Sequence, residues 1–144
     1  MDTTVPNAFL DERAPDRMLL TRRFWGERLP AFEPVISTVT LREIQDTPSP
    51  ITRASIEEMV AGFVVLDFGE EAYDLAQQYA ARGVFTERYV SDANHVAIAV
   101  VNGVTLFVSW NFRHLVKLAT RREVNLLNAI AGYQDIEILA PPEL

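Results

Sequence analysis

Apolar residues along this chain occur in two alternating kinds of segment. Short apolar runs bounded by turn-forming residues predict strands over residues 34–37, 63–66, 105–109 and 136–139. Longer segments, in which apolar and charged positions recur every three or four residues, predict helices over 15–29, 40–44, 53–61, 70–82, 87–101, 112–118 and 121–130. Strands that alternate with helices are typical of an α/β fold with a mostly parallel sheet and helices on its faces.

Residues at the ends of these segments support the assignment. Pro15 suits the first turn of a helix, and Gly83 can end one. Either Ser37 or Thr38 can cap the helix that follows the first predicted strand. The run 105–109 is β-branched and aromatic along its length, so we expect it in the middle of a sheet that is covered on both faces.

The size and composition of the chain indicate one domain. Its 144 residues are 49% hydrophobic and 23% charged, which is enough apolar material for one core, so we expect a single domain over 1–144. No apolar run approaches the ~18 residues of a membrane-spanning helix, and the first residues do not resemble a signal peptide. We therefore expect a cytoplasmic protein with no membrane partner. The lack of cysteine excludes a disulfide, a thiolate metal site and a thiol nucleophile.

The net charge of −7 argues against a protein that coats nucleic acids, because such proteins attract phosphates with an excess of Lys and Arg. It does not exclude a nuclease, since divalent cations bound by carboxylates reverse the local sign of the field. A flavodoxin-like or nucleotide-binding α/β protein is a weak alternative, because the chain has no glycine-rich phosphate loop of either common type.

Acidic and amide side chains lie where a parallel sheet would bind a ligand. Asp2 belongs to the opening segment, whereas Glu43 and Asn111 each follow a predicted strand. Ligands of parallel α/β sheets bind beyond the carboxyl ends of the strands. Asp92 comes from a helix with small and apolar neighbours, and burial of its carboxylate requires compensation, for which a shared divalent cation is sufficient. These side chains are therefore candidate metal ligands.

The chain resembles the PIN-domain family, in particular its VapC-like bacterial branch, over nearly its whole length. The segments that carry the resemblance are 2–6 (DTTVP), 39–44 (VTLREI), 91–97 (SDANHVA) and 109–114 (SWNFRH). The resemblance implies a three-layer α/β/α sandwich with a mostly parallel central sheet. It also implies a metal-dependent endoribonuclease.

The same resemblance assigns roles to individual residues. It implies that Asp2, Glu43 and Asp92 hold Mg²⁺ or Mn²⁺ and that Asn111 completes the catalytic set, at a position where the family often has Asp. The hydroxyls of Thr3 and Thr4, which follow Asp2 directly, would then hydrogen-bond to these ligands and support them. Oxygen ligands around an open cluster suit Mg²⁺, and the expected reaction is in-line hydrolysis of RNA phosphodiesters.

The first strand departs from the family pattern. Similar chains place several apolar residues before the first Asp, whereas only Met1 precedes Asp2 here. We therefore expect a truncated first strand. Either translation begins upstream, or the centre of the sheet has a gap or a borrowed strand.

Basic and histidine residues have simpler interpretations. Arg113, Lys117, Arg121 and Arg122 form the concentrated basic stretch of the second half. A solvated helix face explains them, but if RNA binds, Arg113 and Lys117 are the expected contacts to its backbone. His95 is expected to pack or hydrogen-bond inside its helix, and His114 to be a structural feature or a phosphate contact.

A second function stays open beside the nuclease. Asn111 and the truncated first strand favour a catalytically impaired PIN-like protein that acts as an RNA-binding or protein-interaction module. By resemblance, an active chain could be the toxin of a toxin–antitoxin pair, with an antitoxin partner and a homodimeric state. The apolar faces of the helices at 15–29 and 53–61 are the expected contact surfaces.

Overall fold

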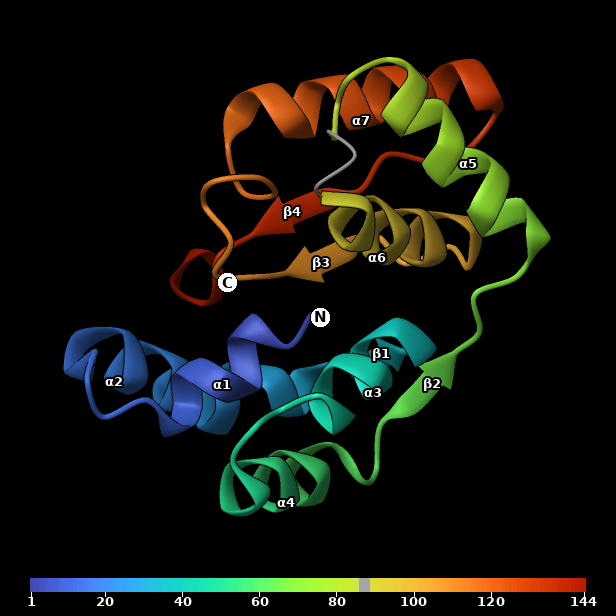
Figure 1. Cartoon of the computed structure of the whole chain (residues 1–144). Helices are drawn as coiled ribbons and strands as arrows, with labels where there is room; N and C mark the ends of the chain where they lie inside the picture. Colours follow the sequence, from blue (N-terminus) through green and yellow to red (C-terminus); the bar gives the residue numbers. More distant parts are fainter. Residues whose placement is uncertain (86–88) are drawn as a thin grey trace.

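A computed structural model describes residues 1–85 and 89–144. The first half contains α1 (Thr4–Leu10), α2 (Pro15–Arg23), β1 (Val35–Ser37), α3 (Thr38–Gln45), α4 (Pro50–Val60) and β2 (Val64–Leu66). The second half contains α5 (Glu70–Ala81), α6 (Val90–Val101), β3 (Leu106–Val108), α7 (Leu118–Ala131) and β4 (Glu137–Leu139). Short π and 3₁₀ turns, η1 (Phe24–Arg28), η2 (Leu29–Ala31) and η4 (Pro141–Glu143), complete these elements (Figure 1).

The strands pair in parallel, as predicted, but they form two separate sheets. β1 pairs with β2, with Val35 opposite Val64, and β3 pairs with β4, with Leu106 opposite Glu137. The chain is thus a mixed α/β protein. The described residues do not form one continuous central sheet, because no strand among them joins β1 to β3; a gap at the centre of the sheet is one of the outcomes expected from the truncated first strand. Figure 1 shows the N-terminus between the two halves, where such a strand would lie.

Several predicted helices have different limits in the structure. The helix expected over 15–29 ends at Arg23 and continues as the π turn η1, and α1 was not predicted. The helix expected over 112–118 is wrong, because this segment forms turns in which the amides of Leu115 and Val116 both donate to the carbonyl of Asn111. The expected start of α6 at 87 lies outside the described residues.

Local capping explains where two helices begin. The Oγ of Ser37 accepts from the amide of Thr40 at 3.2 Å, which confirms Ser37 as a cap of α3. Ser49 caps α4 in the same way, so that α4 starts at Pro50 rather than at the predicted residue 53. Because β1 ends where α3 begins, this cap fixes the direction in which α3 leaves the sheet.

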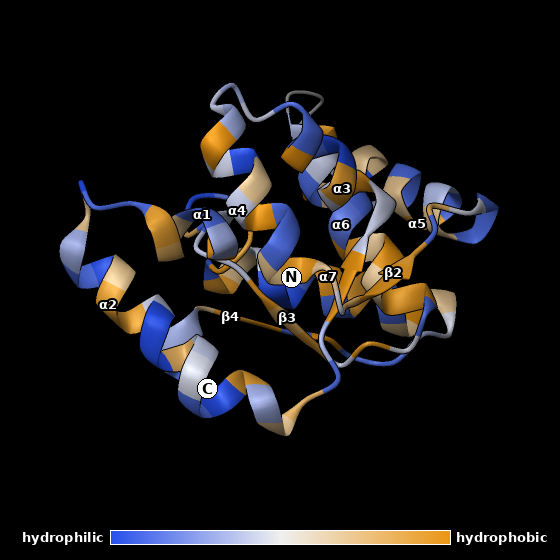
Figure 2. Ribbon diagram, turned by 90° about the horizontal axis from the view of Figure 1, so that it is seen from below, coloured by the Kyte–Doolittle hydropathy of each residue, from blue (hydrophilic) through white to orange (hydrophobic). Residues whose placement is uncertain are grey.

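Among the described residues, the apolar core forms three clusters. The largest cluster joins α5, α6, α7, β3 and β4 through buried residues such as Tyr79, Val96 and Ile138. One smaller cluster lies in the first half around Ile36 and Ile44, and another joins Val5 and Phe24 of the first half to Val108 of β3; Met1 packs against both of them. Figure 2 shows β2 and β3 as hydrophobic ribbons among helices of mixed polarity. In the described ranges, no helix combines the length and apolarity needed to cross a membrane.

A buried polar pair supports the second half of the fold. The hydroxyl of Tyr79 donates to the Oδ1 of Asn128 at 2.5 Å, and both residues have an exposed fraction of 0%. Tyr79→Phe removes this donor from a buried acceptor. We expect the free energy of unfolding in urea to fall by about 1–3 kcal/mol. Tyr73→Phe is the matched control, because Tyr73 lies on the same helix and is 53% exposed. An equal effect of both variants would contradict the prediction.

Candidate functional site

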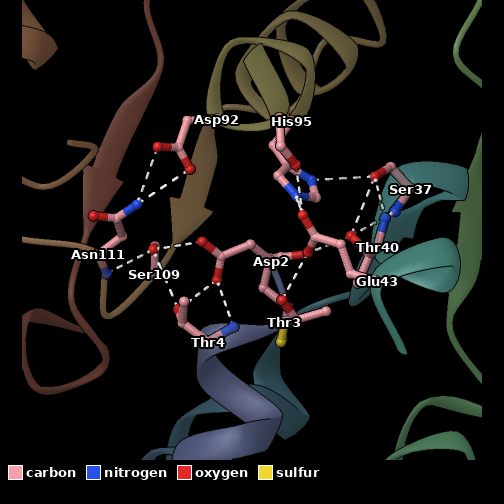
Figure 3. Close-up of polar contacts among 12 residues, drawn as sticks. Asp2, Thr3, Thr4, Ser37, Thr40, Glu43, Asp92, His95, Ser109 and Asn111 are labelled. Atoms are coloured by element: carbon pink, nitrogen blue, oxygen red, sulfur yellow. Dashed lines mark hydrogen bonds and ion pairs between the residues drawn. The ribbon is translucent and has the colours of Figure 1, made fainter. Parts of the chain in front are cut away.

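Four segments that are distant in sequence meet beside the carboxyl ends of β1 and β3 (Figure 3). Asp2 directly precedes α1, Glu43 lies in α3, and Asp92 lies in the first turn of α6. Asn111 follows β3. Figure 3 shows the side chains of these residues arranged around one region of the molecule. The structure therefore brings together all four residues that the sequence singled out.

Asp2 is the most deeply buried of the acids, with an exposed fraction of 3%. Its Oδ1 accepts from the amide and the hydroxyl of Thr4 at 3.1 and 2.5 Å, and its Oδ2 accepts from the Oγ of Ser109 at 2.6 Å. Thr4 is fixed in turn by the amide of Trp110, which donates to its Oγ1 at 2.8 Å. These donors replace the water that the carboxylate loses on burial and set its orientation.

Glu43 is held by three side chains from two other parts of the chain, the N-terminal segment and α6. Its Oε2 accepts from the hydroxyl of Thr3 at 2.7 Å. Its Oε1 accepts from the hydroxyl of Ser91 at 2.5 Å and lies 3.0 Å from the Nε2 of His95. Burial alone raises the pKa of Glu43, but the histidine and the two hydroxyls outweigh it and lower the pKa to about 2. Glu43 is therefore anionic at neutral pH.

Within the described residues, the side chain of Asp92 hydrogen-bonds to Asn111 and to no other side chain. The amide nitrogen of Asn111 lies 3.1 and 3.2 Å from the two oxygens of Asp92. The Oδ1 of Asn111 accepts from the amide of His114 at 3.0 Å, which fixes the orientation of the Asn111 amide group. Asn111 thus presents a donor, rather than its oxygen, to the carboxylate.

Electrostatic repulsion links the acids. Burial raises the pKa of Asp92 to about 6, and the negative charges of Asp2 and Glu43 contribute to the same shift. The charge of His95 and the Asn111 hydrogen bonds act in the opposite direction. Asp92 therefore stays partly protonated well above its ordinary range, which is the behaviour of a carboxyl group beside other carboxylates.

The chemistry of this site fits a hard divalent cation. Three carboxylates supply oxygen ligands of the type that Mg²⁺ prefers, and a cation would offset the burial and the negative charges that raise the pKa of Asp92. With the side chains as they lie, no group of three or more His, Asp or Glu residues in 1–85 and 89–144 is arranged to hold a metal ion. Asn111 would therefore have to release Asp92 for the three acids to share one ion.

Sequence reasoning underrated three residues of the site. The ring of His95 does not hydrogen-bond within its own helix. Its Nε2 contacts Glu43, and its Nδ1 lies 3.4 Å from the hydroxyl of Ser37. Ser91 and Ser109 were part of the motifs but received no role, although each donates to an acid. The spacing of Asp92 and His95 by three residues, which places them on one face of α6, was the available signal.

The proposed RNA contacts lie beside this cluster in sequence. Arg113 and Lys117 are exposed, whereas Arg121 donates to the carbonyl of Val116 at 2.7 Å and pairs with Glu143. Burial, followed by the charges of Arg113 and Lys117, lowers the pKa of His114. The ring of His114 stacks on Tyr89 with 3.6 Å between the ring centroids. Arg121 therefore has a structural role, whereas Arg113, Lys117 and Arg122 of the basic stretch are exposed.

The two shifted carboxyls predict opposite effects of pH on stability. The pKa of Glu43 is lowered, so its contribution is present above its ordinary value of 4.5 and is lost as the pH falls toward 2. The pKa of Asp92 is raised, so the folded state is favoured while Asp92 is protonated, and that contribution is lost as the pH rises through about 6.

We predict that Asp92→Asn stabilises the chain at pH 8 in the presence of a chelator. The gain in free energy of unfolding should be about 1–2 kcal/mol, reduced from the full shift because the carboxyl is partly solvated, and it should vanish near pH 4. Asp74→Asn, at an exposed acid of α5, should change little at either pH. A loss of stability for Asp92→Asn at pH 8 would contradict the electrostatic account.

Comparisons with known proteins assign no family to this chain. A scan against protein-family models finds no match. A search of curated proteins finds no matching relative.

Proposed function

We propose that this chain is a Mg²⁺- or Mn²⁺-dependent endoribonuclease with a PIN-like α/β/α arrangement. One observation carries the proposal: Asp2, Glu43 and Asp92 come from distant segments, yet they lie around one region, where burial and the negative charges of Asp2 and Glu43 raise the pKa of Asp92. A carboxylate in these surroundings destabilises the folded chain unless a cation or a substrate compensates its charge. An unfavourable cluster of this kind is typical of a functional site rather than of a structural one.

Each residue of the site has a definite part in this proposal. Asp2, Glu43 and Asp92 would hold the cation, while Thr3, Thr4 and Ser109 orient two of these carboxylates through the bonds described above. His95 positions Glu43 and keeps its pKa low. A bound divalent cation supplies an activated water and stabilises negative charge on the phosphoryl group. Asn111 would complete the set as a neutral donor or ligand.

RNA would contact the basic side chains beside the site. Arg113 and Lys117 are exposed and belong to the turn that follows Asn111. Contacts of this kind to the phosphate backbone position a nucleic acid without reading its sequence. They also offset the negative net charge of the chain at the point where RNA must bind.

A catalytically impaired RNA-binding or protein-interaction module is the second candidate. The observation that favours it is the Asn111 amide, which donates to both oxygens of Asp92 and so occupies the side of the carboxylate that a cation would use. Calorimetric titration with Mn²⁺ separates the two candidates. Saturable binding that Asp92→Asn weakens supports the nuclease, and no binding supports the impaired module.

Partners of the chain belong to the same proposal. A toxin role would require an antitoxin, and a homodimer would require a self-complementary surface. Leu19 on α2 and Ile51 on α4 are 67% and 81% exposed, so each offers apolar area to a protein partner.

We predict that Asp92→Asn and Glu43→Gln each abolish cleavage of single-stranded RNA. The loss should exceed about 100-fold at saturating Mg²⁺ or Mn²⁺, because each variant removes a charged ligand. Asp74→Asn should keep full activity, since it removes a charge from an exposed part of α5. Unchanged cleavage in either site variant would reject the assignment of these ligands, and folding of the variants is checked by circular dichroism.

We predict that charge reversal at the border of the site weakens RNA binding without sequence preference. Arg113→Glu combined with Lys117→Glu should raise the Kd for several unrelated RNAs by about 10-fold or more at low salt, and the salt dependence should become shallower. The matched control is Arg28→Glu combined with Arg82→Glu, which makes the same change in net charge at exposed positions elsewhere. Equal losses in both double variants would show that only the total charge matters.

A further inference from the structure

A groove lies between the two sheets. Its walls include Met1, Phe24, Leu29, Val35, Leu106 and Val108, and it encloses about 250 Å³. Packing voids in protein interiors rarely exceed the ~30 Å³ that one water occupies in the liquid. The inter-sheet groove is therefore too large to be a packing imperfection, and its walls are mainly apolar. It is also apart from the cluster of acids, since it contains neither Asp2 nor Glu43 nor Asp92.

The backbone of β3 presents hydrogen-bonding groups to this groove. The carbonyl of Thr105 accepts from Glu137, and the amide of Ser109 donates to Leu139, so these residues face β4. Backbone groups of successive residues in a strand point to opposite edges. The amides and carbonyls of Leu106 and Val108 therefore point away from β4, toward the inter-sheet groove.

The backbone of β1 presents hydrogen-bonding groups to the inter-sheet groove from the opposite side. The carbonyl of Pro34 accepts from Val64 of β2, which places the backbone groups of Val35 on the opposite edge. The carbonyl of Val35 accepts from the terminal nitrogen of Met1 at 3.0 Å. In the described parts of the chain, no strand pairs with these two facing edges. Two parallel edges and apolar walls are the surroundings of a central strand in a parallel sheet.

We propose that the inter-sheet groove is a docking site for one extended apolar segment, joined to the nitrogen of Met1, that pairs with β1 and β3 as a parallel strand. The Met1 nitrogen already donates a hydrogen bond to the carbonyl of Val35. In a longer chain the same nitrogen would be a peptide amide and would make the same bond. The direction also agrees, since a segment that leads into Asp2 runs toward the carboxyl ends of β1 and β3, where the acids lie.

The hydrogen bond of the terminal nitrogen supports this occupant, because the nitrogen donates to the Val35 carbonyl on the edge of β1 that faces away from β2. An amide in its place would keep the hydrogen bond to Val35 and carry no charge. The proposal is independent of the nuclease proposal, because it concerns pairing and stability rather than metal or RNA.

The test adds five residues before Met1. One extension reads Val-Ile-Val-Ile-Val, and the matched control reads Gly-Ser-Gly-Ser-Gly, each after a new start methionine. The apolar extension should raise the Tm by about 5 °C or more relative to the control. In hydrogen exchange, the amides of Leu106 and Val108 should be slowed at least about 10-fold, whereas the amide of Ser109, already bonded to β4, should change little.

Two further arms keep the result decisive. A Thr-Val-Thr-Val-Thr extension retains strand propensity with less risk of aggregation and should give the same protection. The Val-Ile-Val-Ile-Val peptide added in solution tests the attachment to Met1. Equal exchange rates in the apolar, Thr/Val and Gly/Ser extensions would overturn the proposal. Protection by the free peptide but not by either extension would overturn attachment to Met1.

Discussion

The burial of Asp2 between the two halves of the chain is the constraint on which the site depends. Asp2 bonds Ser109 at the end of β3, its neighbour Met1 bonds Val35 of β1, and its neighbour Thr3 bonds Glu43 of α3. The first three residues therefore connect both sheets to the acids. A carboxylate in this position requires several hydrogen-bond donors, and the sequence supplies them as hydroxyls on adjacent segments.

The acids do not stabilise the fold by themselves. The charged form of Glu43 is favourable because His95 and two hydroxyls compensate its burial. The charged form of Asp92 is unfavourable because the carboxyl is buried and its neighbours Asp2 and Glu43 are negative, which together raise its pKa to about 6. Retention of an unfavourable carboxyl on the inner side of α6 is understandable if that carboxyl has a function. His95 is the residue that makes the difference between the two acids, since it contacts Glu43 directly.

Local signals in the sequence predicted most of the helices and strands, but they missed α1 and wrongly predicted a helix over 112–118, and they could not predict how distant segments pack. The alternation of strands and helices, the Ser37 cap and the positions of the acids followed from neighbouring residues. The division into two sheets did not, because it depends on whether a strand lies between β1 and β3. The contact of His95 with Glu43 depends on the packing of α6 beside α3. The segment after Asn111 has the apolar spacing of a helix, but it forms a turn in which two amides donate to the carbonyl of Asn111.

The most direct test of the account is the position of manganese in crystals soaked with MnCl₂, observed by anomalous scattering. The account predicts an anomalous peak in contact with Asp2, Glu43 and Asp92, with Asn111 turned away from Asp92. Crystals that show manganese elsewhere, with Asn111 still bonded to both oxygens of Asp92, would contradict a shared metal site.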